Sequence, residues 1–283
     1  MPMKSVLEVL TSTTTYFQDK GVESPRLNIE HLLAHILGKK SRMDLYMEFD
    51  RPLGHKELDT LRELVRKRAQ GIPLQHLLGD TEFHGRTFLT DSRALVPRPE
   101  TEHFVELLLK LELPAALRCL DVGTGSGVIA LTLAAERPGA QVQAVDRSGN
   151  ALGLARENAR KLALESRVEF LEGDLFAPCP GPYDLIAANL PYIPVGDIAG
   201  LAREVQHDPM LALDGGQDGL EIVTRCIAEA PVKLAPGGWL GLEIGHDQAP
   251  RVRELLEAAK YGQIRVEKDF QDVPRFVFAT RPA

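Results

Sequence analysis

The sequence is poor in cysteine, in aromatic residues and in long apolar runs. Its three cysteines, Cys119, Cys179 and Cys226, are far apart and odd in number, which is typical of reduced thiols and fits no zinc or thioredoxin-like spacing. No apolar run approaches the roughly 20 residues that cross a bilayer. The first residues also lack the charged-then-apolar layout of a signal peptide. We therefore expect a cytoplasmic protein with no membrane partner.

An excess of basic residues is also absent. The chain has 33 Lys and Arg against 40 Asp and Glu, a net charge of −7, and residues 1–85 hold 12 of each sign. The whole net charge therefore lies in the remainder. Because nucleic-acid binding usually leaves a basic footprint, we expect no stable nucleic-acid partner. The cluster Arg66-Lys67-Arg68 is interpreted as a solvated helix face, and contact points for a nucleic acid are the alternative interpretation.

Metal ligands are equally scarce. His31 and His35 stand four residues apart on an expected helix, a spacing that can bind a metal ion. No carboxylate or third ligand accompanies them at a suitable spacing, so we interpret both as ordinary helix-surface histidines. We expect no metal site.

A chain of 283 residues is long enough for two domains. Residues 1–82 carry apolar residues at helical spacing in three stretches, which predicts a helical bundle. Residues 83–96 alternate loosely with period two around turn residues, and we expect a β-hairpin linker there. Residues 97–283 form the predicted second domain. Its opening run Pro97-Arg98-Pro99-Glu100-Thr101-Glu102 suits a helix start, although a stiff linker is compatible with the same spacing.

The second domain alternates short apolar runs with amphipathic stretches. This alternation predicts an α/β fold, a Rossmann-like, mostly parallel sheet of seven strands with helices on both faces. The expected strands are 118–122, 142–145, 168–170, 184–188, 239–243, 264–266 and 275–279. The expected helices are 127–136, 151–162, 220–234 and 249–259.

A glycine-rich turn follows the first of these strands. The strand ends in Asp121, and the turn then reads Gly123-Thr124-Gly125-Ser126-Gly127 before a helix. Glycines allow the backbone to approach a ligand closely. Asp146 closes the next strand, about 20 residues further on, where an acid is placed to bind ribose hydroxyls. Glycines that merely make a turn are the alternative interpretation.

The spacing of these glycines departs from the dinucleotide pattern Gly-x-Gly-x-x-Gly. Gly-x-Gly-x-Gly after a strand that ends in Asp resembles S-adenosylmethionine-dependent methyltransferases instead. Asp174, in the loop after the third strand, is a candidate acceptor for the adenine amino group. A simple loop acid is equally compatible with its position.

The stretch Asn189-Leu190-Pro191-Tyr192 ends another buried strand. Leu185 to Ala188 is a short apolar run, and Pro191 cannot extend a central strand. Open α/β sheets bind their ligands at the carboxyl ends of their strands. We therefore treat this tetrapeptide as the candidate catalytic segment.

Methyl transfer to an amide or an exocyclic amine suits that segment. The lone pair of such a nitrogen is delocalised, so the nitrogen is a weak nucleophile. The side-chain oxygen of Asn189 and the backbone carbonyl of Leu190, held by Pro191, are placed to accept its two N–H groups, and Tyr192 to pack on the planar group. Such a reaction needs no strong general base.

Over nearly its whole length the sequence resembles the release-factor glutamine methyltransferases, the PrmC/HemK family. The resemblance rests on the glycine turn, Asp146, the Asn189 to Tyr192 stretch and five further segments. These are Pro73-Leu74-Gln75, Phe83-His84-Gly85, the Val96 to Glu102 run with Ala212 to Leu220, and Glu243-Ile244-Gly245.

The resemblance implies methylation of the side-chain amide of the glutamine in the Gly-Gly-Gln motif of peptide-chain release factors. It implies S-adenosylmethionine as cofactor and S-adenosylhomocysteine as product. Cofactor contacts are implied for Asp121, the turn from Gly123 to Gly127, Asp146, Asp174 and Asn189. The helical domain is expected to help hold the release factor, and Phe83 and Gly85 to help close the substrate site.

Two residues depart from the family pattern. Leu190 stands where the family usually has proline, and Asn-Leu-Pro-Tyr is also how ribosomal RNA adenine dimethyltransferases spell the site. Leu175 stands where a tryptophan is common, so we expect it to be a wall of the cofactor site only. The alternatives are an adenine-N6 methyltransferase acting on ribosomal RNA or DNA, and a cofactor-binding module without catalysis.

Overall fold

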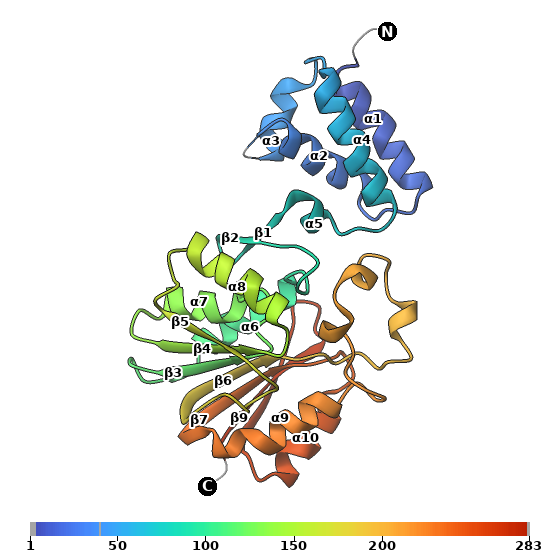
Figure 1. The fold of residues 1–283 in the computed structure, drawn as a ribbon. Coiled ribbons are helices and arrows are strands. Elements are labelled where there is room, and N and C mark those ends of the chain that lie inside the picture. The colour runs from blue at the N-terminus through green and yellow to red at the C-terminus, as the bar shows by residue number, and fades with distance from the viewer. Residues whose placement is uncertain (1–3, 40, 282–283) are drawn as a thin grey trace. The chain divides into compact units, whose positions relative to one another are not determined.

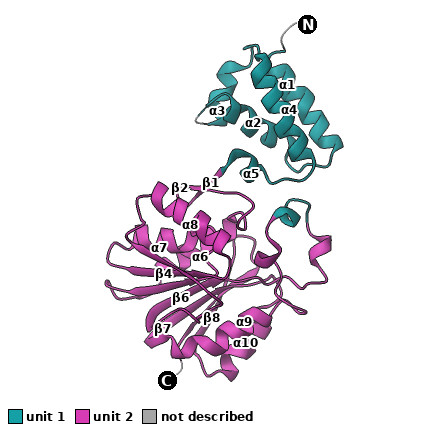
Figure 2. Cartoon of the chain, viewed as in Figure 1, with its two compact units in different colours: residues 1–79, 202–207 teal, residues 80–201, 208–283 magenta. Residues whose placement is uncertain are grey.

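The computed structural model describes residues 4–39 and 41–281. The chain divides into two compact units (Figure 2). The first comprises the chain up to Gly79 together with the separate segment 202–207, and the second comprises residues 80–201 and the chain from Asp208 onward.

Helices make up the first unit, as the apolar spacing predicts. Its three long helices are α1 (Val6–Asp19), α2 (Pro25–Ile36) and α4 (His55–Ala69) (Figure 1). The short helices are α3 (Arg42–Leu45), α5 (Leu74–Leu78) and the 3-10 turn η1 (Tyr46–Glu48). These short helices were not predicted, because three to five residues are too few to show a helical period.

A buried arginine ties the segment 202–207 to the first unit. Arg68 is only 3% exposed, so its interpretation as part of a solvated face is wrong. Its guanidinium donates to Asn28 Oδ1 at 2.6 Å and to the Ile72 carbonyl at 3.2 Å, and it pairs with the Glu204 carboxylate. A charge can be buried in this way only when its donors are satisfied.

The second unit contains a seven-stranded sheet, which confirms the predicted fold class. The strand order is β5-β4-β3-β6-β7-β9-β8. All pairs from β5 to β7 are parallel, whereas β9 is antiparallel to both of its neighbours. The strands are β3 (Arg118–Val122), β4 (Gln141–Asp146), β5 (Val168–Glu172), β6 (Tyr183–Asn189), β7 (Leu234–Glu243), β8 (Gly262–Lys268) and β9 (Pro274–Thr280).

Helices cover both faces of this sheet (Figure 1). The helices α6 (Pro99–Leu109), α7 (Val128–Glu136) and α8 (Gly149–Lys161) lie on one face, and α9 (Glu221–Glu229) and α10 (Ala249–Ala258) on the other. Side chains alternate accordingly along the strands. Leu120 packs into the core that contains Val223 of α9, and its neighbour Cys119 packs into the core that contains Phe104 of α6.

The hairpin lies earlier than expected and belongs to the second unit. Its strands are β1 (Asp80–Phe83) and β2 (Arg86–Leu89), and residues 94–96 form no strand. His84 and Gly85 both have positive φ, at +48° and +70°, as a two-residue type I′ turn requires. The hairpin therefore spans residues 80–89 and not the expected 83–96.

A search of the described residues for a helix long and apolar enough to span a membrane finds none.

The buried arginine gives a stability prediction. Replacing Glu204 with alanine leaves one face of the Arg68 guanidinium without its anionic partner. We expect the free energy of unfolding to fall by about 1–3 kcal/mol in denaturant titrations followed by circular dichroism. Asp197→Ala, at an exposed position of the same loop, is the control and is expected to change it by less than about 0.5 kcal/mol. Equal losses in the two variants would contradict the assignment.

Candidate functional site

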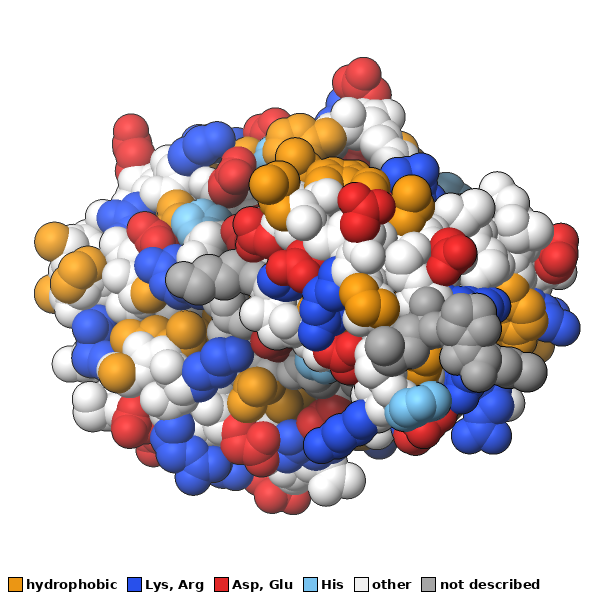
Figure 3. Space-filling view, turned by 90° about the horizontal axis from the view of Figure 1, so that it is seen from above, with side chains coloured by type: hydrophobic (Ala, Val, Ile, Leu, Met, Phe, Trp, Pro, Cys, Tyr) orange, Lys and Arg blue, Asp and Glu red, His pale blue; other side chains and the backbone are white. Residues whose placement is uncertain are grey.

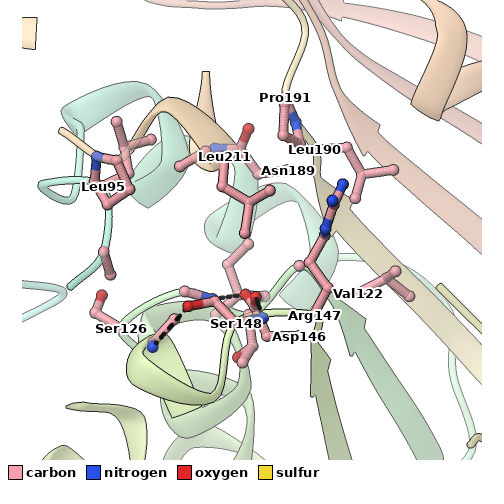
Figure 4. Close-up of a pocket in the computed structure, with 18 of the residues that line it drawn as sticks. Leu95, Val122, Ser126, Asp146, Arg147, Ser148, Asn189, Leu190, Pro191 and Leu211 are labelled. Carbon is pink, nitrogen blue, oxygen red and sulfur yellow. Dashed lines mark hydrogen bonds between the residues drawn. The ribbon is translucent and has the colours of Figure 1, made fainter. Parts of the chain in front are cut away.

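A cavity opens at the carboxyl ends of the neighbouring strands β3 and β6. From β3 the chain continues to β4 and β5 on one side of the sheet, and from β6 it continues to β7 on the other side. Such a switch point is where open α/β sheets bind ligands. Figure 4 shows Asp146 and Ser148 on one side of the cavity and Asn189 and Pro191 across from them. The lining comprises residues 93–98, 101, 122–126, 128–129, 145–148, 151, 173–175, 189–191, 209, 211–212 and 222.

The glycine turn has the conformation that its sequence predicts. Gly123, Gly125 and Gly127 all have positive φ. A Cβ on Gly127 would lie 3.2 Å from the Cβ of Ala155, and one on Gly123 would lie 3.1 Å from Leu190 Cδ2. Glycine is therefore required both by the backbone angles and by the close approach of neighbouring segments. Gly123 and Gly125 line the cavity, whereas Gly127 caps α7 outside it.

Asp146 lies on the wall of the cavity beside this turn. Its Oδ2 accepts from the Gly125 N–H at 2.9 Å, and its Oδ1 accepts from the Ser148 N–H at 2.8 Å. Burial raises its pKa, and these backbone donors oppose the rise. Each carboxylate oxygen has a second lone pair, so the residue retains acceptor capacity for a ligand hydroxyl.

Asp121 lies beneath the turn and does not line the cavity. It is fully buried, and its Oδ2 accepts from Thr124 Oγ1 at 2.6 Å and from the Ala130 N–H at 3.1 Å. Burial raises its pKa to about 7. The hydrogen bonds of Asp121 therefore shape the turn, and Thr124 and Ser126 line the cavity.

The segment Asn189-Leu190-Pro191 is at the opposite wall. Strand β6 ends at Asn189, as the following proline predicts. Asn189 Nδ2 donates to Thr101 Oγ1 at 3.0 Å. Leu190 is only 4% exposed and packs beside Gly123, so the leucine side chain is accommodated at this position.

Tyr192, the last residue of the tetrapeptide, does not line the cavity. Burial raises the pKa of its hydroxyl to about 12, with the Glu243 carboxyl contributing in the same direction. Its backbone carbonyl accepts from Gln248 Nε2 at 2.9 Å. These contacts anchor the chain immediately after the cavity, and stacking of the ring on a substrate stays a prediction.

Phe83 and Gly85 also lie outside the cavity lining. Phe83 is 2% exposed and packs edge to face on Phe88, with ring centroids 5.9 Å apart. Gly85 forms the hairpin turn beside Glu102 and Glu136. A role of this turn in closing the substrate site stays a prediction.

Asp174 and Leu175 lie on the wall that follows β5. The Asp174 carboxylate pairs with Arg225 at 2.6 Å and is 52% exposed. Leu175 is buried, with a positive φ of 46°. Leu175 is thus an apolar wall, as expected, and the Asp174 carboxylate carries an ion pair that the sequence did not indicate.

Sequence reasoning missed several residues around the cavity. Arg98 lines it and pairs at 2.9 Å with Asp208, whose side chain is fully buried and also accepts from the Val96 N–H. Leu95 and Leu211 add apolar walls. The run from Val96 to Glu102, quoted above only as part of a resemblance, was the signal that could have identified the first of these.

Glu243 is a further buried acid, which the sequence analysis did not predict to be a site residue. It is the Cα partner of Asn189 on β7 and is 2% exposed. Burial raises its pKa to about 7, while side-chain hydrogen bonds with Thr101 and Asn189 and the charge of Arg275 pull the pKa down.

The site offers binding and orientation rather than a strong nucleophile. All three cysteines are buried and lie outside the cavity, and burial raises the pKa of the Cys119 and Cys226 thiols to about 12. Within the described residues, no cluster of three or more His, Cys, Asp or Glu side chains is arranged to hold a metal ion. The cavity suits a reaction in which a bound electrophile and a bound acceptor are held together.

Comparison with known proteins gives concordant matches for both units. Residues 8–79 match the PrmC N-terminal domain, and residues 101–202 match the methyltransferase small domain. The release factor glutamine methyltransferase of Chlorobaculum tepidum is 41% identical over 283 residues, which cover 96% of this chain and 95% of that protein. The protein of the same name from Deinococcus radiodurans is 42% identical and covers 97% of this chain and 98% of its own length.

Solved structures support the fold of the second unit. A methyltransferase from Pyrococcus furiosus has a TM-score of 0.55 and 19% identity, covering 71% of this chain and 91% of its own. The 16S rRNA N2 G1207 methyltransferase of Thermus thermophilus has a TM-score of 0.51 and 21% identity, covering 71% of this chain and 49% of its own.

The buried acids predict an unusual dependence of stability on pH. Because the pKa of Asp121 is raised to about 7 in the fold, the folded chain keeps a proton that the unfolded chain loses near pH 4. The free energy of unfolding should therefore fall as pH rises from about 4 to about 7. Asp121→Asn is expected to reduce this fall by on the order of 2 kcal/mol in denaturant titrations at pH 5 and pH 8.

Asp197→Asn, at an exposed position, is the control and should keep the slope of the unmodified protein. An unchanged slope in Asp121→Asn would show that Asp121 is ionised throughout this range.

Proposed function

The chain belongs to the family of the release factor glutamine methyltransferases, and from this premise we propose how its cavity transfers a methyl group from S-adenosylmethionine to the side-chain amide nitrogen of a release-factor glutamine. The observation that supports this most directly is the position of Asn189. Its side chain lines the cavity across from the glycine turn, and its Nδ2 is engaged by Thr101.

The residues present fit S-adenosylmethionine. Gly123 and Gly125 line the cavity with backbone alone, and a Cβ on Gly125 would have only the Ala94 Cβ, 3.9 Å away, within 4 Å. The methionine and ribose part can therefore lie against the backbone beside Gly125. Asp146 retains lone pairs for the ribose hydroxyls, and the apolar side chains of Val145, Leu175 and Ile222 suit the adenine. When bound, the cofactor supplies an electrophilic methyl group and leaves as S-adenosylhomocysteine.

Asn189 and Leu190 would orient the glutamine. The amide nitrogen carries two N–H groups, and the Asn189 Oδ1 and the Leu190 carbonyl oxygen are the acceptors that the segment offers. Accepting both hydrogens fixes the nitrogen and increases its electron density. The nitrogen held in this way would present its lone pair to the methyl group that the bound cofactor supplies, and the surplus N–H proton would pass to water.

The finer assignments form part of the same proposal. The glutamine is that of the Gly-Gly-Gln motif, the helical unit helps to hold the release factor, and the Phe83 to Gly85 turn helps to close the substrate site. The cytoplasm is the proposed location, since translation takes place there.

On the face shown in Figure 3, basic and acidic side chains are interspersed rather than gathered by sign, which supports a protein rather than a nucleic acid as substrate.

Labelled S-adenosylmethionine tests the substrate. It is offered with a release factor, with the Gln→Ala form of its Gly-Gly-Gln motif, and with ribosomal RNA. Label is expected on the unmodified release factor alone. Label on RNA alone would overturn the proposal in favour of adenine methylation, and label on none of the three, with cofactor bound, would favour a non-catalytic module.

Two variants separate catalysis from cofactor binding. Asn189→Ala removes an acceptor for the substrate amide and should lower kcat by about 100-fold or more, with a smaller change in the Kd for S-adenosylmethionine. Asp146→Ala should do the reverse and weaken cofactor binding by about 10-fold or more. Calorimetric titration and single-turnover assays make both measurements. Near-normal turnover in Asn189→Ala would show that the amide-orienting role is wrong.

A further inference from the structure

Asn189 has a side chain whose two ends are nearly equal in shape and opposite in chemistry. Oδ1 accepts hydrogen bonds, whereas Nδ2 donates them. An amide turned by 180° would present its NH₂ group to the substrate N–H that Oδ1 is to accept, and would repel that N–H. The catalytic role of Asn189 therefore requires a contact that distinguishes its two ends.

Thr101 contacts the nitrogen end of the Asn189 amide. It lies in the first turn of α6, where Pro99 starts the helix, and it is only 4% exposed. Its Oγ1 accepts from Asn189 Nδ2 at 3.0 Å. A hydroxyl alone cannot select one end of an amide, because it can donate as well as accept.

Glu243 removes that ambiguity. It is paired with Asn189 in the register of β6 and β7, is 2% exposed, and has side-chain hydrogen bonds with Thr101 and Asn189. Above about pH 7 Glu243 is mainly ionised and only accepts, so the single hydroxyl hydrogen of Thr101 is then directed to Glu243. The Thr101 oxygen is then left as an acceptor, which the Nδ2 end of Asn189 satisfies and the Oδ1 end cannot.

We infer that Thr101 and Glu243 are positioning residues that hold the Asn189 side chain with its Oδ1 end toward the substrate amide. The inference rests on the proposed function, since it assigns a task to residues behind the amide-orienting asparagine. It also gives a physical reason for two sequence segments, Pro99-Glu100-Thr101 and Glu243-Ile244, that otherwise contribute no catalytic group.

The test uses the full-length protein with a release factor as substrate. Thr101→Val keeps the shape and removes the hydroxyl, and Thr101→Ser restores the hydroxyl. We expect Thr101→Val to lower kcat by about 10- to 100-fold, with KM and the Kd for S-adenosylmethionine changed by less than about threefold, and Thr101→Ser to stay within about threefold of the unmodified protein.

The matched control is Thr132→Val. Thr132 is also a fully buried threonine, on α7, and in the described part of the chain its Oγ1 has no hydrogen-bond partner. This variant is expected to keep its turnover.

Glu243→Gln replaces the acceptor-only group by one that also donates and should lower kcat by about tenfold. It provides a second route to the answer if Thr101→Val does not fold.

A double-mutant cycle distinguishes positioning from general structural damage. If Thr101 acts through Asn189, then Thr101→Val combined with Asn189→Ala should be no slower than Asn189→Ala alone. Losses that multiply in the double variant, or normal turnover in both Thr101→Val and Glu243→Gln, would overturn the inference. Normal turnover in Asn189→Ala would instead refute the amide-orienting role itself, so the two failures can be told apart.

Discussion

The pairing of β6 between β3 and β7 is the constraint on which the site depends. Its register places Ala188 beside Val122 and Asn189 beside Glu243. Asn189 is thereby brought next to the glycine turn on one side and next to a buried carboxyl group on the other. A slip of one residue would turn the side chain of Asn189 to the opposite face of the sheet and separate it from both.

This arrangement buries carboxyl groups, which disfavours their ionised forms. Asp121, Asp146 and Glu243 lie near the carboxyl edge of neighbouring strands, and burial raises the pKa of each. Backbone N–H groups, a threonine hydroxyl and the Asn189 amide compensate by donating hydrogen bonds. Groups with perturbed pKa values gather at functional sites. Here Asp121 bonds to the turn, Glu243 is the register partner of Asn189, and Asp146 lines the cavity.

Several parts of the fold and site followed from the sequence because they are local. The period of apolar residues indicated the three long helices, and the alternation of strands and helices indicated the sheet. The glycine turn, Asp146 and the end of β6 at Asn189 could be identified because each depends on residues adjacent in the chain. The hairpin was misplaced by a few residues because His84 and Gly85, and not the later turn residues, adopt positive φ.

Other parts depend on residues far apart in the chain. Nothing near Arg68 in the sequence indicates Asn28 or Glu204 as its partners, and nothing near Asp208 indicates Arg98. Thr101 and Asn189 are 88 residues apart. The sequence alone therefore determined the class of fold, the glycine turn and the end of β6 at Asn189. Only the tertiary structure decided which end of that asparagine is held and by which residues, because contacts across strands and helices are set by packing and not by spacing along the chain.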